Sequence, residues 1–206
     1  MATLDFYFDF GSPTSYMAHK VLPRIAGAAG TDVNWRPMLL GGVFKATGNA
    51  SPALVAAKAF HMNIDMARFA EKYGIELTFN SSFPINTLAL MRGAASYLDE
   101  ESFSRYVDLM FDAIWLNDRN MNEPDVVGEV LASGDFDPGD FMQRINDPKV
   151  KERLKSDTEA AVARGIFGAP SIFVDDQLYF GQDRLHFVAE ALGVNICDVC
   201  PKYVET

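Results

Sequence analysis

Cysteine, histidine and clustered basic residues are scarce in this sequence, and each shortage excludes a class of protein. The 206 residues include only two cysteines, Cys197 and Cys200, too few for the disulfide framework of a small secreted protein. The three histidines, His19, His61 and His186, lack the spacing of a metal site or of a serine–histidine–aspartate triad. We therefore expect no metal, and we interpret the histidines as structural or surface residues.

Positive charge and long apolar runs are missing as well. The formal net charge is -10 and no stretch is rich in lysine or arginine, so we expect no nucleic-acid partner. No run approaches the roughly 20 apolar residues of a membrane span, and residues 1–10 lack the pattern of a secretory signal. We therefore expect no membrane association and a cytoplasmic location. An anionic small molecule would need local cations, because the overall charge repels it.

What is present is the composition of an ordinary folded protein, and its first forty residues have the pattern of a β-α-β unit. Apolar residues alternate with others over Leu4–Phe10, which is typical of a strand. Gly11-Ser12-Pro13 then provides a good N-cap residue before a proline that a first helical turn tolerates. We expect the helix to end between Gly27 and Gly30, and a second strand over Thr31–Met38.

The middle of the chain, from about Ser51 to Arg164, has helical patterns. Apolar residues recur at spacings of three and four at Phe103, Tyr106, Val107, Met110, Phe111 and Ile114. Pro124 and Pro148 divide this region into several helices. It is followed by a predicted hairpin, in which residues 171–174 and 177–180 flank two turn-forming acids, and by a final helix that Asp183 should cap.

This order of elements predicts an α/β thioredoxin-like fold interrupted by a large all-helical insertion. We expect residues 1–50 and 160–206 to form the thioredoxin-like domain and residues 51–159 to form the helical insertion domain. No linker rich in proline, glycine or serine separates the two parts. The insertion should therefore pack on the parent core.

Ser12 stands where the first helix begins, and two roles for its hydroxyl remain open. Either it only caps the helix, or it also donates a hydrogen bond to a thiolate bound at the partly positive helix terminus. A thiol with a pKa of about 8.5 is only about 3 % ionised at pH 7, and lowering that pKa by about two, or about 2.7 kcal/mol, makes thiolate the majority form. One charge-assisted hydrogen bond and a helix terminus are enough for this change.

Two other local motifs carry weaker signals. Ala169-Pro170 precedes a predicted strand, where a cis peptide bond would expose backbone groups to a peptide-like ligand, although X-Pro bonds are more often trans. Cys197-Asp198-Val199-Cys200 has the spacing of a redox motif but lies at the chain end, not at a strand-to-helix junction. We interpret these cysteines as incidental thiols in a mobile tail.

Four motifs in order carry a family resemblance that spans nearly the whole chain. They are Phe8–Tyr16, Gly41–Asn49, Gly165–Pro170 and Phe180–Leu185. Together they closely resemble the 2-hydroxychromene-2-carboxylate isomerases and the kappa-class glutathione transferases, members of the thioredoxin-like, disulfide-oxidoreductase-A-like superfamily. The resemblance implies that glutathione is the cofactor and that the protein is a homodimer.

The same resemblance assigns roles to individual residues. Ser12 corresponds to the serine that hydrogen-bonds the glutathione sulfur and is the expected catalytic residue. Pro170 corresponds to a cis-proline, and the Ala169 backbone to the segment that pairs with the cysteinyl unit. Asn49 and Lys58 match positions that contact glutathione in the transferases. Lys58 also supplies a cation, which an anionic tripeptide requires in so acidic a protein.

The remaining positions concern the γ-glutamyl end and the second substrate. Gln182 and Asp183 match the pair that binds the γ-glutamyl end, where the acid meets the ammonium group and the amide and a helix N-terminus meet the carboxylate. The transferases more often have serine at the position of Gln182. The helical insertion leaves a cleft for the second substrate, and Phe83, Asn86 and Trp115 are candidates for its lining.

The activity that the resemblance implies is glutathione-dependent cis–trans isomerisation of a small aromatic-catabolism intermediate, through reversible addition of the thiolate. Conjugation of an electrophilic substrate is the first alternative, and a non-catalytic glutathione-binding module is the second. Thiol–disulfide exchange is disfavoured, because Ser12 occupies the position that needs an attacking cysteine.

Overall fold

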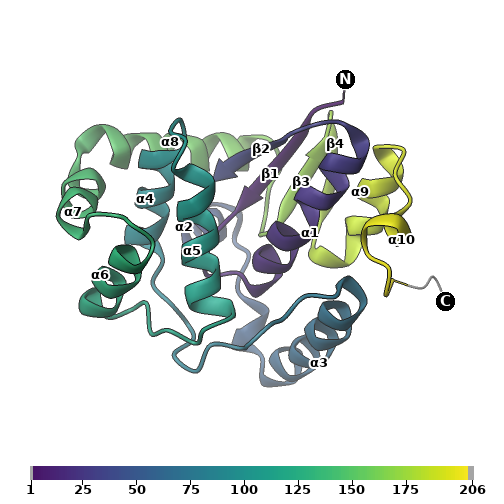
Figure 1. Ribbon diagram of the computed structural model, residues 1–206, viewed down its shortest axis with the longest axis horizontal. Helices are drawn as coiled ribbons and strands as arrows, with labels where there is room; N and C mark the ends of the chain where they lie inside the picture. Colours follow the sequence, from purple (N-terminus) through teal and green to yellow (C-terminus); the bar gives the residue numbers. More distant parts are fainter. Residues whose placement is uncertain (1, 204–206) are drawn as a thin grey trace.

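A four-stranded mixed sheet forms the centre of the computed structural model, which describes residues 2–203 (Figure 1). Its strands are β1 (Leu4–Phe8), β2 (Val33–Pro37), β3 (Ser171–Val174) and β4 (Gln177–Phe180). They lie in the order β2-β1-β3-β4, with β1 and β2 parallel and the other neighbouring pairs antiparallel. The β-α-β opening and the hairpin of residues 171–180 are thus as the sequence predicts.

The helices fall into two groups along the chain. Those that adjoin the strands are α1 (Pro13–Ala29), α2 (Leu40–Thr47), α8 (Pro148–Ala163), α9 (Leu185–Ala191) and α10 (Ile196–Val199), with the 3-10 turn η2 (Gln182–Arg184). Between α2 and α8 lie α3 (Ala56–Tyr73), α4 (Leu88–Tyr97), α5 (Phe103–Trp115), α6 (Pro124–Ser133) and α7 (Pro138–Asn146), with the 3-10 turn η1 (Pro52–Leu54). A large helical insertion therefore separates β2 from β3, which confirms the predicted fold class.

The two faces of the sheet pack against different helices. Because side chains alternate along a strand, Phe6 of β1 and its register partner Ile172 share one face and join the core that includes α1 and α9. Phe173 lies on the opposite face, where it packs with Val43 of α2 and Ala161 of α8. The sheet is thus covered on both sides, and α2 and α8 form a separate layer from α1 and α9 (Figure 1).

The first strand is shorter than the alternation of its residues predicts. The prediction extended it to Phe10, but β1 ends at Phe8, whose register partner on β2 is Pro37. Proline has no N–H to continue the ladder, and the Asp9 carboxylate accepts a bond from the Gly11 N–H at 2.8 Å, which turns the chain. Phe10 remains fully buried although it is outside the strand.

The predicted apolar stripe of the insertion is confirmed, and it faces the sheet. Each of its residues is buried on α5: Phe103, Tyr106, Val107, Met110, Phe111 and Ile114. The Phe111 ring centroid lies 4.8 Å from that of Phe10 and 5.7 Å from that of Phe8. The insertion therefore packs directly on the strand that leads to Ser12, as expected from the absence of a linker.

The C-terminal region differs from the prediction in two ways. Asp183 does not cap the final helix: it lies inside η2, and α9 begins after Arg184. The segment from Ile196 to Tyr203 is packed and is not the mobile tail that we expected, because Cys200 is buried and the Tyr203 ring stacks on Tyr73 at 5.7 Å. Ring packing across distant parts of the chain has no local sequence pattern, which explains this error.

The predicted boundary between the two domains, residue 160, lies within α8. This helix contacts α2 and β2 as well as α4 and α7. The division into residues 1–50 with 160–206 and residues 51–159 therefore stays a prediction. Among residues 2–203, no helix combines the length and the apolar character that crossing a membrane requires.

Candidate functional site

Ser12 lies in the turn between β1 and α1, where it is the N-cap residue of the helix. Its backbone is extended, with φ of -101° and ψ of 111°, and its Oγ accepts a hydrogen bond from the Ser15 N–H at 3.0 Å. Pro13 follows at the first helical position, where its missing N–H costs nothing. The predicted capping role is confirmed.

Capping leaves the Ser12 proton available for a second interaction. A hydroxyl has one proton to donate and two lone pairs, and the cap uses only a lone pair. The Ser12 Oγ lies 3.2 Å from the Ala169 carbonyl oxygen, to which it can donate, and 2.9 Å from the Thr14 Oγ1. The two roles that the sequence left open are therefore compatible, because they use different parts of the same group.

Thr14 is a neighbour of Ser12 that the sequence reasoning did not single out. Its Oγ1 lies 3.3 Å from the same Ala169 carbonyl oxygen, so two hydroxyls share one acceptor. Thr14 is half-buried, whereas Ser12 is 4 % exposed. A second hydroxyl two residues after the N-cap is the sequence signal that would have identified it.

Asp9 fixes the geometry of this turn, and sequence reasoning missed it too. Its Oδ1 accepts from the Gly11 N–H at 2.8 Å and from the Thr87 Oγ1 at 2.7 Å, while its Oδ2 accepts from the Leu40 N–H at 2.8 Å. One carboxylate therefore connects the turn, the start of α2 and the residue before α4. The spacing Asp-x-Gly is a local signal for the first of these bonds.

The Asp9 side chain is an unusual ionisable group, because it is 1 % exposed. Burial raises the pKa of its carboxyl above the ordinary value of 3.8, and the hydrogen bonds from Gly11, Leu40 and Thr87 oppose that rise. Desolvation, which disfavours the charged form, is the largest of these effects.

The loop before β3 completes the turn from the other side. The Ala169-Pro170 peptide bond is cis, as the family resemblance implied, and so is Phe83-Pro84. The Pro170 carbonyl accepts from the Gly181 N–H at 3.0 Å, and the Ser171 Oγ donates to the Gly168 carbonyl at 2.8 Å. This loop is therefore held against β4 while its Ala169 carbonyl faces the two hydroxyls.

Asn49 lies just after α2 and is joined to the same loop. Its Nδ2 donates to the Phe167 carbonyl at 2.8 Å, and its Oδ1 accepts from the Ala50 N–H at 2.9 Å. Asn49 is exposed. The structure thus brings three of the predicted positions together, namely Ser12, Ala169 and Asn49, around the residues 165–170 loop.

Lys58 is placed differently from those three residues. It is exposed in the first turn of α3, which contacts α1 and η1. In Figure 1, α3 lies below the N-terminal end of α1. No ion pair joins Lys58 to a carboxylate within residues 2–203, so its ammonium group is available to an anion.

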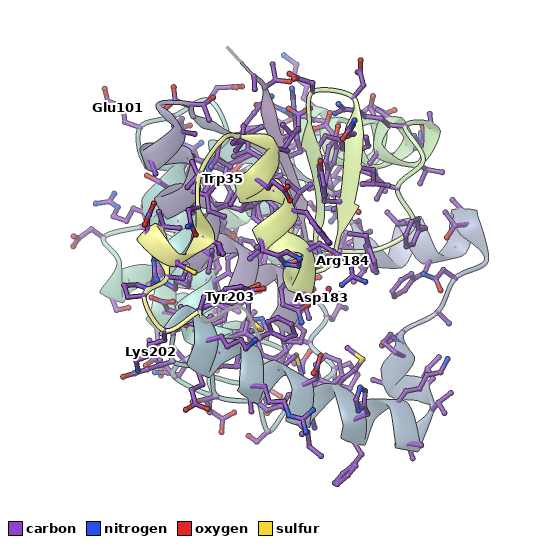
Figure 2. All side chains as sticks on the ribbon, turned by 90° about the vertical axis from the view of Figure 1, so that its right-hand side faces the viewer. Trp35, Glu101, Asp183, Arg184, Lys202 and Tyr203 are labelled. Carbon is purple, nitrogen blue, oxygen red and sulfur yellow. The ribbon has the colours of Figure 1, made fainter. Side chains whose placement is uncertain are left out.

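Gln182 and Asp183 lie in η2, directly after Gly181, whose N–H bonds the Pro170 carbonyl. The turn η2 packs against α1. Gln182 is buried, and its carbonyl accepts from the Tyr73 hydroxyl at 2.5 Å. The Asp183 carboxylate forms an ion pair with Arg184, and Figure 2 shows the two side chains next to each other beside α9. Gly181 has φ of +95°, which favours glycine, and a Cβ there would lie 2.4 Å from the Asp183 Oδ1.

The aromatic residues proposed as cleft lining form a cluster beside the turn. Trp115 is fully buried and its Nε1 donates to the Phe10 carbonyl at 2.7 Å, so it is part of the core. The rings of Phe79 and Phe83 lie 5.9 Å and 6.1 Å from it, and Phe79 is 43 % exposed. Asn86 is exposed, and its Oδ1 accepts from the backbone at the start of α4. This aromatic surface, which is accessible at Phe79, is therefore joined through Trp115 to Phe10, two residues before Ser12.

The cysteines lie away from this arrangement. Neither is in a disulfide, and the Cys197 Sγ donates to the Tyr203 carbonyl at 2.8 Å. Burial raises the pKa of the Cys200 thiol, which disfavours the reactive thiolate. Cys200 therefore lacks the environment of an attacking thiol, and the interpretation of the two thiols as incidental stays a prediction.

Comparisons with known proteins agree with this geometry. The family model described as DSBA-like thioredoxin domain matches residues 3–193. A 2-hydroxychromene-2-carboxylate isomerase of Sphingobium xenophagum is 33% identical over 196 residues, covering 92% of this chain and 97% of that protein. Glutathione S-transferase kappa 1 of Homo sapiens is 27% identical over 205 residues, covering 93% of this chain and 91% of that protein.

Among solved structures, that of a selenomethionine 2-hydroxychromene-2-carboxylate isomerase matches with a TM-score of 0.82 and 29% sequence identity. The match covers 93% of this chain and 94% of the other. Both the sequence relatives and this structure extend over nearly the whole chain. The chain belongs to the DSBA-like thioredoxin domain family and, within it, to the family of the 2-hydroxychromene-2-carboxylate isomerases and kappa-class glutathione transferases.

Proposed function

We propose that the protein is a glutathione-dependent cis–trans isomerase of the 2-hydroxychromene-2-carboxylate isomerase type, acting on a small aromatic-catabolism intermediate. The observation that carries the proposal is the Ser12 hydroxyl at the start of α1, whose proton is not needed for capping and whose Oγ lies 3.2 Å from the Ala169 carbonyl oxygen. The isomerases among its relatives, at 33% identity for one of them, supply the reaction type.

The residues present fit glutathione in three respects. Ser12 offers one donor for a sulfur anion, at a helix terminus that favours negative charge. Asn49 is exposed beside the residues 165–170 loop, and Lys58 supplies an unpaired cation. The Asp183 carboxylate is available for an ammonium group if it shares or exchanges its contact with Arg184. When bound, glutathione would supply a thiolate that adds to a conjugated substrate and leaves after rotation about the former double bond.

Ser12 would act by turning its proton from the Ala169 carbonyl toward the sulfur. Thr14 lies within 3.3 Å of that carbonyl oxygen, so its hydroxyl keeps the carbonyl hydrogen-bonded when Ser12 turns away. A fully buried carbonyl left without a donor costs about 1–3 kcal/mol, and the half-buried Ala169 carbonyl would cost less. In this proposal Thr14 is a positioning residue, because it makes the change of partner inexpensive.

The aromatic cluster supports an aromatic second substrate. Phe79 and Phe83 present accessible ring surface next to Trp115, whose indole is fixed to the backbone residue before Gly11. Stacking against such rings holds a planar substrate near the sulfur position. We propose that Phe83 and Phe79, and not the buried Trp115, touch the substrate.

Conjugation remains the second candidate, because the kappa-class transferases are also full-length relatives. Incubation with 2-hydroxychromene-2-carboxylate and less than one equivalent of glutathione separates the two, with products followed by NMR. Isomerisation predicts that all substrate equilibrates while free glutathione stays constant. Accumulation of a thioether, with glutathione consumed in proportion, would support conjugation instead.

Calorimetric titration with glutathione tests the third alternative, a non-catalytic module. Saturable heat without turnover of either kind would support such a module, whereas the absence of saturable heat contradicts all three hypotheses. The homodimer stays a prediction from the family, and sedimentation of the purified protein checks it.

A further inference from the structure

A groove that none of the predicted site residues lines lies between α2, α4 and α8. Its volume is about 790 Å³. The residues around it are Leu39, Gly42, Lys45, Ala46, Leu88, Arg92, Pro148, Lys151, Glu152, Leu154, Lys155, Thr158, Glu159 and Val162. We call it the α8 groove, because α8 contacts α2 on one side and α4 on the other and so forms its floor.

The floor and walls of the α8 groove are largely apolar. Leu39 and Leu88 are half-buried on its two sides, and Leu154 and Val162 line it from α8. The polar group beneath it, Thr158, is already satisfied, because its Oγ1 donates to the Leu154 carbonyl and accepts from the Leu39 N–H. Its volume is in the range of sites that hold small molecules, about 300–1,000 Å³. The groove therefore favours a ligand with an apolar body.

Cations outnumber carboxylates around this apolar surface, although the protein as a whole carries -10. The lining contains two lysines of α8, Lys45 of α2 and Arg92 of α4, against two glutamates. One lysine, Lys155, pairs with Glu152 at 3.3 Å. Within residues 2–203 no carboxylate forms an ion pair with Lys45 or Arg92. These two cations are thus available to an anion.

We propose that the α8 groove binds a small aromatic carboxylate. An apolar body with one negative charge matches both features, since burial of apolar surface favours the body and Lys45 and Arg92 attract the charge. Inorganic phosphate lacks the apolar body, and the two glutamates disfavour ligands with several charges. Ser12 does not line the groove, and the proposal does not depend on the proposed function.

Naphthoate is a suitable probe, and naphthamide is its neutral analogue. Each is titrated into the full chain while backbone amide signals are followed by NMR. We expect saturable shifts at groove amides such as Gly42, Ala46 and Leu88, and an affinity for naphthamide that is weaker by about fivefold or more. Shifts confined to Gly11–Ser15, or equal affinities for the two compounds, would overturn the proposal.

Two variants test the contacts directly. Lys45→Gln combined with Arg92→Gln should weaken naphthoate binding by about fivefold or more and leave naphthamide binding unchanged. The matched control combines Lys149→Gln with Arg68→Gln, which removes the same charge from exposed positions outside the groove. If both double variants weaken binding equally, overall charge is responsible and the groove contacts are not.

A third variant, Ala46→Trp, places a large side chain at the groove from an exposed helix position, where the fold should tolerate it. We expect it to abolish the naphthoate shifts while thermal unfolding stays unchanged. Naphthoate binding that survives this change contradicts the proposal. A dimer also contradicts the proposal if sedimentation detects it in the wild-type protein, if Ala46→Trp abolishes it, and if naphthoate does not dissociate it.

Discussion

Asp9 and Lys58 stand at opposite extremes of burial within one candidate site. Asp9 is 1 % exposed and accepts hydrogen bonds from three separate segments, whereas Lys58 is exposed on α3. The turn of residues 9–15 is therefore held by the core, and the exposed segment of residues 48–58 is joined to the loop of residues 165–170 by the bond from Asn49 to Phe167. In the proposed function these are the sulfur end and the peptide end of the glutathione site.

This difference teaches how the two ends should respond to substitution. A rigid, buried donor costs little reorganisation when charge develops, so it affects the rate of reaction. An exposed charge interacts with its ligand through screened water, so it affects affinity by a small factor. Substitutions at the sulfur end should therefore have larger effects than substitutions at the peptide end, and the opposite order would contradict this view of the site.

The largest effect should come from Ser12→Ala. Loss of one hydrogen bond to a charged group is worth about 1.5–3 kcal/mol, so we expect isomerase turnover to fall by about 10- to 100-fold. Stability should fall by about 1 kcal/mol, because the cap of α1 is lost. Asp137→Ala is the matched control, since it removes the N-cap of α7 without touching the site. Equal losses of turnover in both variants would assign Ser12 to capping alone.

The second effect concerns stability and belongs to Asp9→Asn. An amide keeps one acceptor oxygen, and its NH2 group must then face the N–H of either Gly11 or Leu40. One buried N–H loses its partner, so the free energy of unfolding should fall by about 2 kcal/mol. Chemical denaturation measures this, with Asp32→Asn, an exposed carboxylate, as the control. A change at Asp9 no larger than that at Asp32 would show that the turn is not held as we describe.

The pH dependence of the free energy of unfolding in Asp9→Asn tests the raised pKa of Asp9. The native pKa of Asp9 is raised above 3.8, so between 3.8 and the native value the folded state binds more protons than the unfolded state. Its contribution to the free energy of unfolding therefore falls as pH rises through that window. Asp9→Asn should remove this fall, and an unchanged pH profile would contradict the raised pKa.

At the exposed end, Lys58→Gln should weaken glutathione binding by about fivefold at most and leave stability unchanged. The loss should shrink as salt is added, because an exposed charge is screened. Lys149→Gln, also exposed but on α8, is the control. A loss from Lys58→Gln larger than that from Ser12→Ala would reverse the comparison between the two ends.

The smallest effect should be that of Asn49→Ala. It removes the donor to the Phe167 carbonyl at an exposed position, and we expect glutathione affinity to fall by about threefold. Calorimetric titration measures the glutathione affinity. Asn34→Ala is unsuitable as a control, because the Asn34 side chain donates to the Asp5 carboxylate. Asn146→Ala, which loses an exposed bond within α7, is suitable. Loss of all binding in Asn49→Ala would mean that this end is as rigid as the Ser12 turn.

Local patterns predicted the parts of the site that local interactions make. The N-cap at Ser12 followed from Ser and Pro at the end of a strand, and the hairpin at 171–174 and 177–180 followed from acids between β-rich runs. The family resemblance implied a cis peptide bond before Pro170, which the structure has, and the Ala169 carbonyl oxygen lies 3.2 Å from the Ser12 Oγ. These features could be predicted from the sequence, because the interacting residues either lie near each other in the chain or belong to a recognisable family motif.

The parts that sequence reasoning missed depend on contacts between distant residues. Leu40 and Thr87, two partners of Asp9, lie 31 and 78 positions away from it, so no spacing rule connects them. The stacking of Tyr203 on Tyr73 orders the C-terminal segment in the same way. Asp183 was read as a cap from its residue type, but the positive φ of Gly181 starts a 3-10 turn one residue earlier. Long-range contacts decided the first two cases, and the local backbone conformation of Gly181 decided the third.

Titration of the glutathione thiol in complex with the protein tests the central claim most directly. The thiolate is followed by its ultraviolet absorbance as pH changes, in the wild-type protein and in Ser12→Ala. In the wild-type complex we predict a thiol pKa about two below the free value of about 8.5. In the Ser12→Ala complex the thiol pKa should rise most of the way back to the free value. Identical thiol pKa values in the two complexes would contradict the account.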